Sequence, residues 1–344
     1  MAEFFGWKAS VTSSKAVILG KEVICDGHEN GYKVRIVTHA HSDHTCSLKE
    51  SVRKCDLVIS TKETKDILMA LGRREAKLLV SANGGDTIKY GEEKIKLIPV
   101  EHILGTVQVL VEREDGTRCL YSSDFKLHGA PTVNCDVLVL DSTYGSPDYI
   151  RPDLNEVYDA LLTIVEDHLA KGRPVHVFGF VGKLQDAMAF LRESKVDAPF
   201  IVSPRMYRVS KVYEKYGFDL GEFYSSEGVI GRKILEKGET HVAFFTPFEK
   251  HRSNIDCVHV ELTGWLFRTP YIRKGENKYI VALSGHADFN QLIQYVERCR
   301  PKYVITDNSR GGQAEKLAKE IEKRLGIYAS PSPLKNTKKL VLDN

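Results

Sequence analysis

The feature that most constrains this chain is residues 34–48, "VRIVTHAHSDHTCSL", in which an apolar, β-branched run leads directly into His39, His41, Asp43 and His44. Alternate residues of an extended segment point to one side, so His39 and His41 are expected to project together where the strand ends. The loop that follows can turn Asp43 and His44 onto neighbouring positions. Nitrogen and oxygen donors without a thiolate are typical of catalytic rather than structural zinc sites. The sequence therefore predicts a metal site at the end of a buried strand.

Four donors in one short run cannot complete two metal coordination spheres, so further ligands must come from elsewhere in the chain. His102 follows the predicted strand 94–100, and Asp124 follows the predicted strand 118–122. Each lies just past a strand end, as the first cluster does. A single histidine or aspartate in such a place is more often an ordinary loop or turn residue. As the continuation of this pattern, however, both are predicted ligands.

Composition and charge narrow the class of protein. The chain has 344 residues and a net charge of +3, from 49 Lys and Arg against 46 Asp and Glu, so any surface for nucleic acid must be a local patch. No apolar run reaches the roughly 18 residues of a membrane span, and the N-terminus lacks the basic and apolar regions of a signal peptide. The seven cysteines are isolated and form no CxxC motif, which argues against a disulfide framework or a cysteine zinc site. We expect reduced thiols in a cytoplasmic protein, or a nuclear one if the source is eukaryotic, with no membrane partner.

The order of the predicted elements indicates an α/β protein with an inserted domain. Short β-runs dominate residues 16–143, whereas residues 150–275 alternate between helix and strand, and a further strand–helix–strand–helix pattern follows from residue 279. A helix is predicted over 153–172, with Asp153 as its N-cap and Gly172 at its end. This order predicts one core domain formed by 1–145 and 276–344, interrupted by an inserted domain at 146–275. The tail at 330–339 is expected to be exposed.

The ordered set of acidic residues and histidines resembles the motifs of the metallo-β-lactamase superfamily. That resemblance implies an αββα sandwich with metal ions at one edge of its two sheets. It also implies that His39, His41 and His102 hold one zinc ion, that Asp43 and His44 contribute to a second, and that Asp124 bridges the two. Asp26, in "VICDGH", would be a carboxylate that steadies the histidine loop. His28 matches no motif and is expected to be a loop residue.

Two further motifs resemble the β-CASP nucleases within that superfamily. "VLVLDSTYGSPDY" carries Asp141 and "ALSGHADFNQLIQYV" carries His286, and the predicted inserted domain lies between them. The resemblance implies that Asp43, Asp141 and His286 are catalytic, with His286 protonating the leaving 3′-oxygen and Asp141 orienting it. "GFVGKLQDAM" resembles the substrate-phosphate loop, in which Gly182 and Lys183 open a helix whose backbone N–H groups favour an anion.

Other candidate substrate contacts are weaker in the sequence. Arg205 and Arg208 form a possible patch for the nucleic-acid backbone, although a solvated helix face explains them equally well. Tyr144 and Trp265 could stack on bases of a single strand, or could simply pack between the domains.

The resemblance implies a zinc-dependent nuclease but gives mixed indications of its polymer. "DSTYGSPDY" and "ELTGWLF" resemble the DNA-processing branch with Artemis and Apollo, whereas "GKLQD" resembles the RNA-processing branch with RNase J. The sequence favours DNA slightly, as single strands or DNA ends cut by a 5′–3′ exonuclease. An RNA-processing endo- or exoribonuclease, a small-molecule hydrolase of the same fold and an inactive nucleic-acid-binding scaffold are the alternatives. Phe180 stands where the DNA branch has a serine that helps to hold a terminal 5′-phosphate.

The third β-CASP motif differs from the RNA-processing branch, which has a zinc-binding histidine there. Alignment on "RPKYVITDNSRGG" places Asn308 at this position, and an amide is a poorer zinc ligand than an imidazole. We therefore expect one tightly held zinc and a second, weaker site, unless Asp307 turns inward as the missing ligand.

Overall fold

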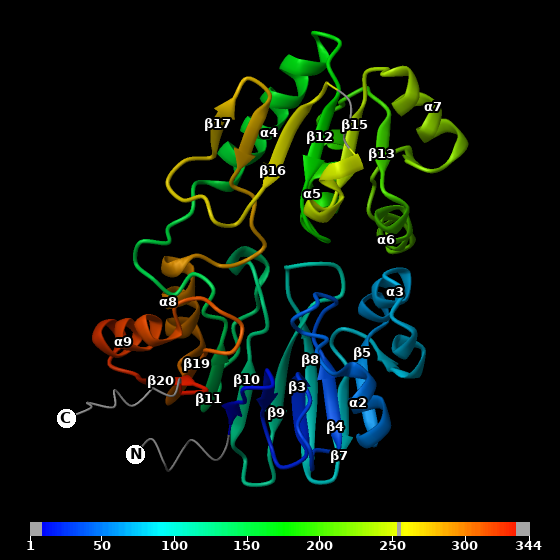
Figure 1. Ribbon diagram of the computed structural model, residues 1–344. Coiled ribbons are helices and arrows are strands. Elements are labelled where there is room, and N and C mark those ends of the chain that lie inside the picture. The colour runs from blue at the N-terminus through cyan, green and yellow to red at the C-terminus, as the bar shows by residue number, and fades with distance from the viewer. Residues whose placement is uncertain (1–8, 253–255, 335–344) are drawn as a thin grey trace, which may run out of the picture.

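The computed structural model describes residues 9–252 and 256–334 and shows two domains that face each other across the ends of the strands of the larger one (Figure 1). The N-terminal residues 1–8 and the predicted exposed tail at 335–339 lie outside the described residues. Within the described part of the chain, no helix combines the length and the apolar composition needed to cross a membrane.

The larger domain is built on two sheets packed face to face. The first sheet has the order β1-β2-β3-β4-β5-β6 and the second the order β20-β19-β11-β10-β9-β8-β7. The strands of the first sheet are β1 (Ser10–Val11), β2 (Ala16–Ile18), β3 (Val23–Asp26), β4 (Val34–Val37), β5 (Leu57–Thr61) and β6 (Val80–Ala82). Those of the second are β7 (Thr87–Tyr90), β8 (Glu93–Pro99), β9 (Val107–Glu112), β10 (Arg118–Tyr121), β11 (Val137–Leu140), β19 (Tyr303–Asp307) and β20 (Tyr328–Ser332).

Helices cover the outer face of each sheet, which confirms the expected αββα sandwich. The helices α2 (Leu48–Lys54) and α3 (Lys62–Ala70) flank the first sheet, and α8 (Phe289–Cys299) and α9 (Ala314–Leu325) flank the second. Strand β11 shows how sequence builds these layers. Its residues Val137 and Val139 pack into the core between the sheets, while Leu138 and Leu140 pack into the core under α8 and α9. Because both faces are covered, all four residues are apolar and buried.

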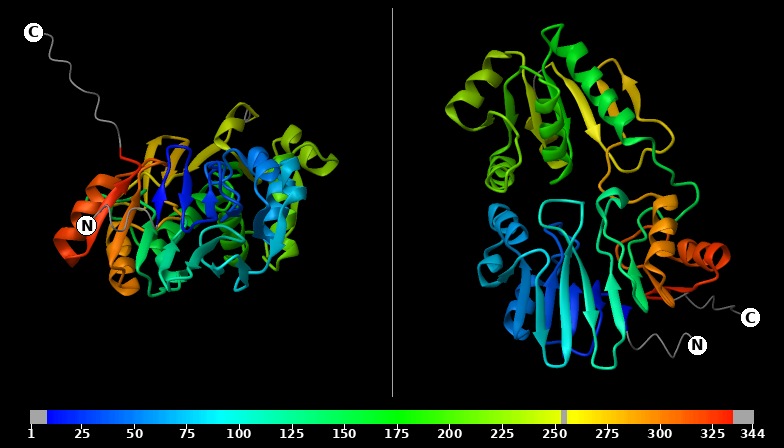
Figure 2. Two further views of the ribbon diagram at one scale, coloured as in Figure 1. Left: turned by 90° about the horizontal axis from the view of Figure 1, so that it is seen from below. Right: turned by 180° about the vertical axis from the view of Figure 1, so that it is seen from behind.

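The inserted domain has a third sheet, of order β14-β13-β15-β12-β16-β18-β17, with helices on both faces (Figure 2). Its strands are β12 (Val175–Phe178), β13 (Phe200–Val202), β14 (Phe223–Ser225), β15 (Val242–Phe245), β16 (Val258–Leu262), β17 (Tyr271–Gly275) and β18 (Lys278–Val281). Its helices are α4 (Leu154–Leu169), α5 (Lys183–Glu193), α6 (Pro204–Lys215) and α7 (Val229–Lys237). Helix α4 begins after Asp153, whose side chain caps it as predicted.

Two predictions from the sequence need correction here. The inserted domain does not end at 275, because β17 and β18 form an antiparallel hairpin and β18 also pairs with β16 of the inserted sheet. The boundary therefore falls after Val281. The tail is not free at 330–332, since β20 adds to the edge of the second sheet beside β19. Pro331 is tolerated there because an edge strand needs hydrogen bonds on one side only.

Candidate metal centre and active-site cleft

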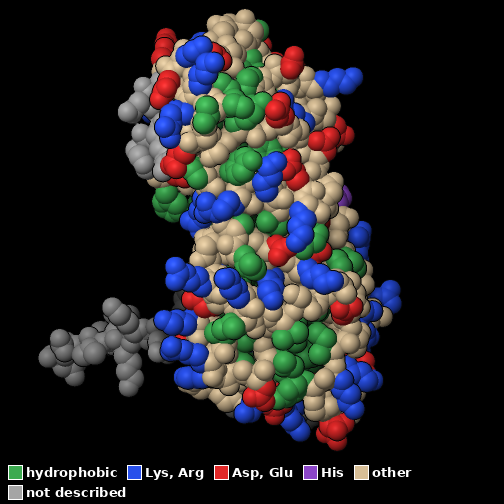
Figure 3. Space-filling model, turned by 90° about the vertical axis from the view of Figure 1, so that its right-hand side faces the viewer, with side chains coloured by type: hydrophobic (Ala, Val, Ile, Leu, Met, Phe, Trp, Pro, Cys, Tyr) green, Lys and Arg blue, Asp and Glu red, His purple; other side chains and the backbone are tan. Residues whose placement is uncertain are grey.

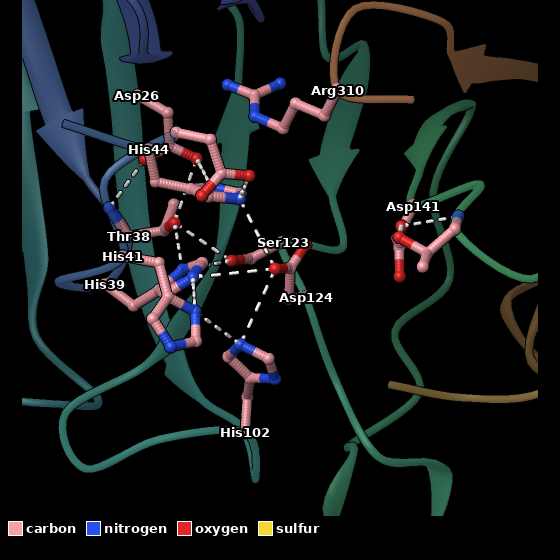
Figure 4. Close-up of polar contacts among 12 residues, drawn as sticks. Asp26, Thr38, His39, His41, His44, His102, Ser123, Asp124, Asp141 and Arg310 are labelled. Carbon is pink, nitrogen blue, oxygen red and sulfur yellow. Dashed lines mark hydrogen bonds and ion pairs between the residues drawn. The ribbon is translucent and has the colours of Figure 1, made fainter. Parts of the chain in front are cut away.

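The predicted ligands come together at the edge of the sandwich that faces the inserted domain. His39 and His41 follow β4, His102 follows β8, and Asp124 follows β10. The ends of three strands that are far apart in sequence therefore bring these side chains together. The Nε2 atom of His39 and the Nε2 atom of His102 each lie 3.1 Å from Nδ1 of His41. An Asp124 carboxylate oxygen lies 3.5 Å from Nε2 of His39 and from Nε2 of His102 (Figure 4). The ligand atoms of a tetrahedral zinc ion lie about 3.3 Å apart, so these four residues fit zinc.

The other ring nitrogen of each histidine is fixed by an oxygen acceptor. Nε2–H of His41 donates to the Val181 carbonyl at 3.1 Å, and Nδ1–H of His102 donates to the Gly285 carbonyl at 2.7 Å. The Thr38 hydroxyl gives its proton to Asp26, so at 3.1 Å it accepts from Nδ1–H of His39. The second nitrogen of each ring, Nε2 of His39 and His102 and Nδ1 of His41, is therefore unprotonated, and its lone pair points toward the predicted metal position. Burial lowers the pKa of His39, His41 and His102, which keeps the rings neutral as metal ligands must be.

His44 lies on the far side of Asp124 from His102 and is held by Asp26. Its Nδ1–H donates to Asp26 at 2.7 Å, while its Nε2 lies 3.3 Å from Asp124 and 3.5 Å from Asp43. Burial lowers the pKa of His44, but Asp124 and Asp26 more than offset this and raise it to about 10. The position beside its Nε2 therefore favours a positive charge, whether a proton or a metal ion. Asp124 keeps a pKa well below its usual value because His44 and His286 outweigh the effect of burial.

Asp26 supports both the histidine loop and His44, and its replacement should weaken metal binding. One carboxylate oxygen accepts from the Thr38 N–H at 2.8 Å, and the other accepts from His44. Asp26 also has a positive φ of 63°, which asparagine tolerates better than most residues. Asp26→Asn should therefore fold, but its single amide oxygen cannot serve both donors. We expect zinc affinity to fall by about 10- to 100-fold, measured by competition with a chromophoric chelator. Unchanged affinity would show that Asp26 does not steady the ligands.

A buried network that the sequence did not reveal lies behind Asp26. Arg35, at the centre of β4, is fully buried and donates to the Asp26 carbonyl, to the His44 carbonyl at 3.3 Å and to the Ser51 hydroxyl at 2.8 Å. His28 lies in a loop as predicted, but it is buried there and its Nδ1 lies 3.0 Å from the same Ser51 hydroxyl. The signal was available as an arginine within the apolar run "VRIV", since a buried arginine needs several acceptors.

Asp141 and His286 meet beside the metal cluster. Nδ1 of His286 lies 3.0 Å from an Asp141 carboxylate oxygen, and its Nε2 lies 3.9 Å from Asp124. The other Asp141 oxygen accepts from the Thr143 N–H and hydroxyl at 2.9 and 2.7 Å, which fixes the carboxylate. Burial lowers the pKa of His286, but Asp124 and Asp141 raise it above its usual value overall. The pair therefore presents an oriented imidazole toward the ligand cluster.

The cleft next to these residues contains only part of the predicted substrate-binding set. A cavity of about 280 Å³ is lined from both domains, by His41, Ser42, Asp43, His102, Ile103, Phe180, Val181, Lys183, Asp186, Gly285 and His286. Lys183 lines this cavity, and burial followed by the charge of Arg151 lowers its pKa to about 8. Gly182 precedes α5, but its N–H already donates to the Gln185 side chain at 2.9 Å, so it is not free for a phosphate.

Arg205 and Arg208 do not reach this cleft, contrary to one of the two sequence interpretations. Both are exposed on α6, and Arg208 donates to the carbonyls of Ala70 and Pro204 at 3.0 and 3.2 Å. Figure 3 views the molecule from the side of α3 and α6 and shows Lys and Arg side chains interspersed with acidic ones. The solvated helix face is therefore the better interpretation of these two arginines.

The two aromatic candidates differ in exposure. Tyr144 is buried, and its hydroxyl donates to the Gly264 carbonyl at 2.6 Å, so it packs between the domains rather than stacking on bases. Trp265 is 58% exposed but is not among the residues that line the cleft. Phe180 does line it and is 47% exposed, with its ring 6.2 Å from that of Phe248.

Comparison with known proteins agrees with this architecture. Residues 271–330 match the family described as "Zn-dependent metallo-hydrolase RNA specificity domain". A probable DNA ligase of Opitutus terrae is 26% identical over 324 residues, which cover 87% of this chain but 30% of the ligase. An uncharacterized protein in the lig 3′ region of Acidianus ambivalens is 39% identical over 135 residues, covering 39% of this chain and 96% of that protein.

The chain is also similar to an RNase J-like protein and to a solved structure. An RNase J-like protein of Methanocaldococcus jannaschii is 25% identical over 370 residues, which cover 85% of each chain. The crystal structure of a protein of unknown function from Enterococcus faecalis has 16% sequence identity and a TM-score of 0.58, covering 81% of this chain and 76% of that one. At that identity, the similarity to the E. faecalis structure concerns the fold alone.

Proposed function

Because this chain belongs to the β-CASP nucleases of the metallo-β-lactamase superfamily, we propose that it is a zinc-dependent nuclease that hydrolyses phosphodiester bonds. The observation that carries the proposal is the position of the Asp141–His286 pair, 3.9 Å from the Asp124 carboxylate of the ligand cluster. A metal-bound phosphate would therefore lie next to an oriented acid. The rival proposal of an inactive scaffold is tested by zinc analysis and a nuclease assay on the purified protein. Oligonucleotide binding with neither zinc nor cleavage would favour the scaffold.

The residues of the cleft have separate roles in this proposal. His39, His41, His102 and Asp124 would hold zinc, which when bound would lower the pKa of a water molecule to about 7, giving a nucleophile at neutral pH, and would polarise the phosphoryl group. Lys183 adds a positive charge to the wall of the cleft for the phosphate backbone. His286 delivers a proton to the leaving 3′-oxygen, and Asp141 holds the ring in the tautomer that can do so. Asp43 is partly exposed at the rim of the cleft, and its carboxylate lies 3.5 Å from Nε2 of the buried His44.

The polymer is proposed to be DNA, with single strands or DNA ends as substrates. The probable DNA ligase, which matches over most of this chain, and the relative named for the lig 3′ region support DNA. The match to an RNA specificity domain and the RNase J-like relative favour RNA as the second candidate. Side-by-side digestion of end-labelled DNA and RNA, each with 5′-phosphate and 5′-hydroxyl ends, separates the two. Cleavage of RNA with inert DNA would reverse the proposal, and indifference to the 5′ end would indicate an endonuclease.

Phe180 is proposed to stack on an unpaired base at the mouth of the cleft. A stacked base contributes about 1–3 kcal/mol, so Phe180→Ala should weaken binding of a single-stranded oligonucleotide by roughly 5- to 150-fold. Fluorescence anisotropy in the presence of EDTA measures binding without cleavage. Tyr328→Ala, which removes an exposed aromatic from the edge strand β20, is the matched control and should bind normally. Equal affinity of both variants and the wild type would remove Phe180 from the substrate path.

A further inference from the structure

The side chain of Arg310 is buried beside the metal cluster and is used by none of the roles described so far. It belongs to the segment between β19 and α9, and it is 9% exposed. One NH group pairs with the Asp307 carboxylate, and the other donates to the Lys15 carbonyl at 2.6 Å. Its Nε–H has no hydrogen-bond partner among the described residues. A buried donor without a partner is costly, so an oxygen of a bound ligand that met this N–H would be favoured.

Arg310 lines a small cavity together with Asp43 and Asp124, two carboxylates that would contribute to a second metal site. The cavity has a volume of about 30 Å³, enough for one water or one ligand oxygen, and is lined by Asp43, Tyr121, Asp124, Asp141, Thr143, His286, Asp307, Arg310 and Gly311. Figure 4 shows the Arg310 guanidinium above Asp26 and His44, on the opposite side of them from His102. The carboxylates of Asp43, Asp124, Asp141 and Asp307 and the guanidinium of Arg310 thus line a cavity that can hold one water molecule or one ligand oxygen.

The end of β19 offers no spare ligand for a second ion. Asn308 donates through its side chain to the Pro333 carbonyl at 3.1 Å, which turns it toward the C-terminal strand rather than toward the metal cluster. Asp307 faces the cavity instead, but one of its oxygens accepts from the Ser309 N–H and hydroxyl at 2.7 and 2.6 Å, and the other pairs with Arg310. At the third β-CASP motif, Asp307 is therefore engaged in an ion pair with Arg310 and is not free to bind a metal ion.

We propose that Arg310 takes the place of the second metal ion. Its fixed positive charge neutralises the carboxylates that a second zinc would neutralise, and Asp307 serves as its counter-ion rather than as a ligand. The unpaired Nε–H is left to meet an oxygen of the bound phosphate in the cavity. The inference rests on the proposed function only in assuming that the histidine cluster holds zinc.

The charges around Arg310 support this proposal. Burial lowers the pKa of Arg310, but Tyr121, Asp307, Asp26 and Asp124 raise it above its ordinary value, so the guanidinium stays charged at every accessible pH. A divalent ion next to a fixed guanidinium is repelled, and in a water-poor cavity that repulsion is weakly screened. The chain should therefore hold one zinc ion tightly, at His39, His41, His102 and Asp124.

The test counts zinc rather than cleavage, so its result is independent of the substrate and of nuclease activity. Zinc per chain is measured by plasma mass spectrometry after dialysis against a mild chelator. Wild type should retain one zinc, whereas Arg310→Met should retain two, because the repulsive charge is gone and Asp307 is released as a ligand. Adding Asp307→Asn to Arg310→Met should return the count to one. Arg298→Met, which removes an exposed arginine of α8, should stay at one.

Other variants keep the proposal testable if Arg310→Met does not fold. Arg310→Lys preserves the charge and should hold one zinc, and Asp307→Asn alone should also hold one, because Asp307 is not a ligand. Two zinc ions in the wild type, with one lost in Asp307→Asn, would overturn the proposal and make Asp307 the missing ligand. A folded Arg310→Met with one zinc would overturn it equally. A wild type that binds no zinc would instead contradict the proposed function.

Discussion

Asp124→Asn is expected to remove both tightly bound zinc and cleavage, the largest effect of any single substitution in this chain. The carboxylate lies within 3.5 Å of ring nitrogens of His39, His44 and His102, so it is shared by every part of the cluster. Asparagine keeps its size but replaces an anionic donor by a neutral amide, which is a poor zinc ligand. Metal catalysis supplies several kcal/mol of transition-state stabilisation, so the rate should fall by about 10³-fold or more.

The measurement pairs zinc content with the initial rate on a labelled oligonucleotide. Circular dichroism should show a folded protein, because Asp124 and asparagine have nearly the same volume. Asp148→Asn is the control, since Asp148 is an exposed carboxylate paired with Lys316 and should leave zinc and rate unchanged. Cleavage at the wild-type rate by Asp124→Asn would disprove the assignment of the metal centre.

His286→Ala is expected to slow cleavage by about 10²- to 10⁴-fold while leaving the zinc content unchanged, as for the loss of a general acid. His286 contacts Asp141 at 3.0 Å and lies beside the ligands without being part of the four-residue set that fits zinc. Asp141→Asn should lower the rate of cleavage by a smaller factor, about 10- to 100-fold, because it disturbs the orientation of the His286 ring and does not remove the proton donor.

A substrate with a sulfur atom in place of the leaving 3′-oxygen separates acid catalysis from phosphate binding. A thiolate leaves without protonation, since thiols have pKa values of about 8.5. On this substrate the difference between wild type and His286→Ala should shrink to within about tenfold, because the general-acid contribution is no longer needed. An undiminished difference would mean that His286 binds the phosphate and does not protonate the leaving group.

The sequence identified those parts of the molecule that depend on residue type and local spacing. The ligands His39, His41 and Asp124 were predicted because strand ends place side chains at a sheet edge, and the structure brings them together. The hairpin β17–β18 was missed because one of its strands was assigned to the next domain, and pairing across a sheet has no local signature.

The structure brings together the predicted metal ligands but only some of the predicted substrate-binding residues. Lys183 lines the cleft, but Arg205 and Arg208 face solvent, although all three are basic residues at or near the start of a helix. The periodicity of α6 places Arg205 and Arg208 on its polar face, yet whether that face borders the cleft depends on how the inserted domain sits on the sandwich. Local sequence carries no information about that placement.

The sequence alone determined the fold class and the donor set, because these depend on short-range periodicity and on the chemistry of each side chain. Tertiary structure alone decided which nitrogen of His41 and of His102 bears the proton, since the carbonyls of Val181 and Gly285 come from the inserted domain and from the segment after it. Tertiary structure also decided which groups surround the buried arginines Arg35 and Arg310. Arg310 pairs locally with Asp307, three residues before it, but only tertiary packing brings its other NH group to the Lys15 carbonyl and brings Arg35 to the carbonyls of Asp26 and His44. A buried charge is stabilised by whatever surrounds it in three dimensions, so its partner and its role are properties of the folded chain.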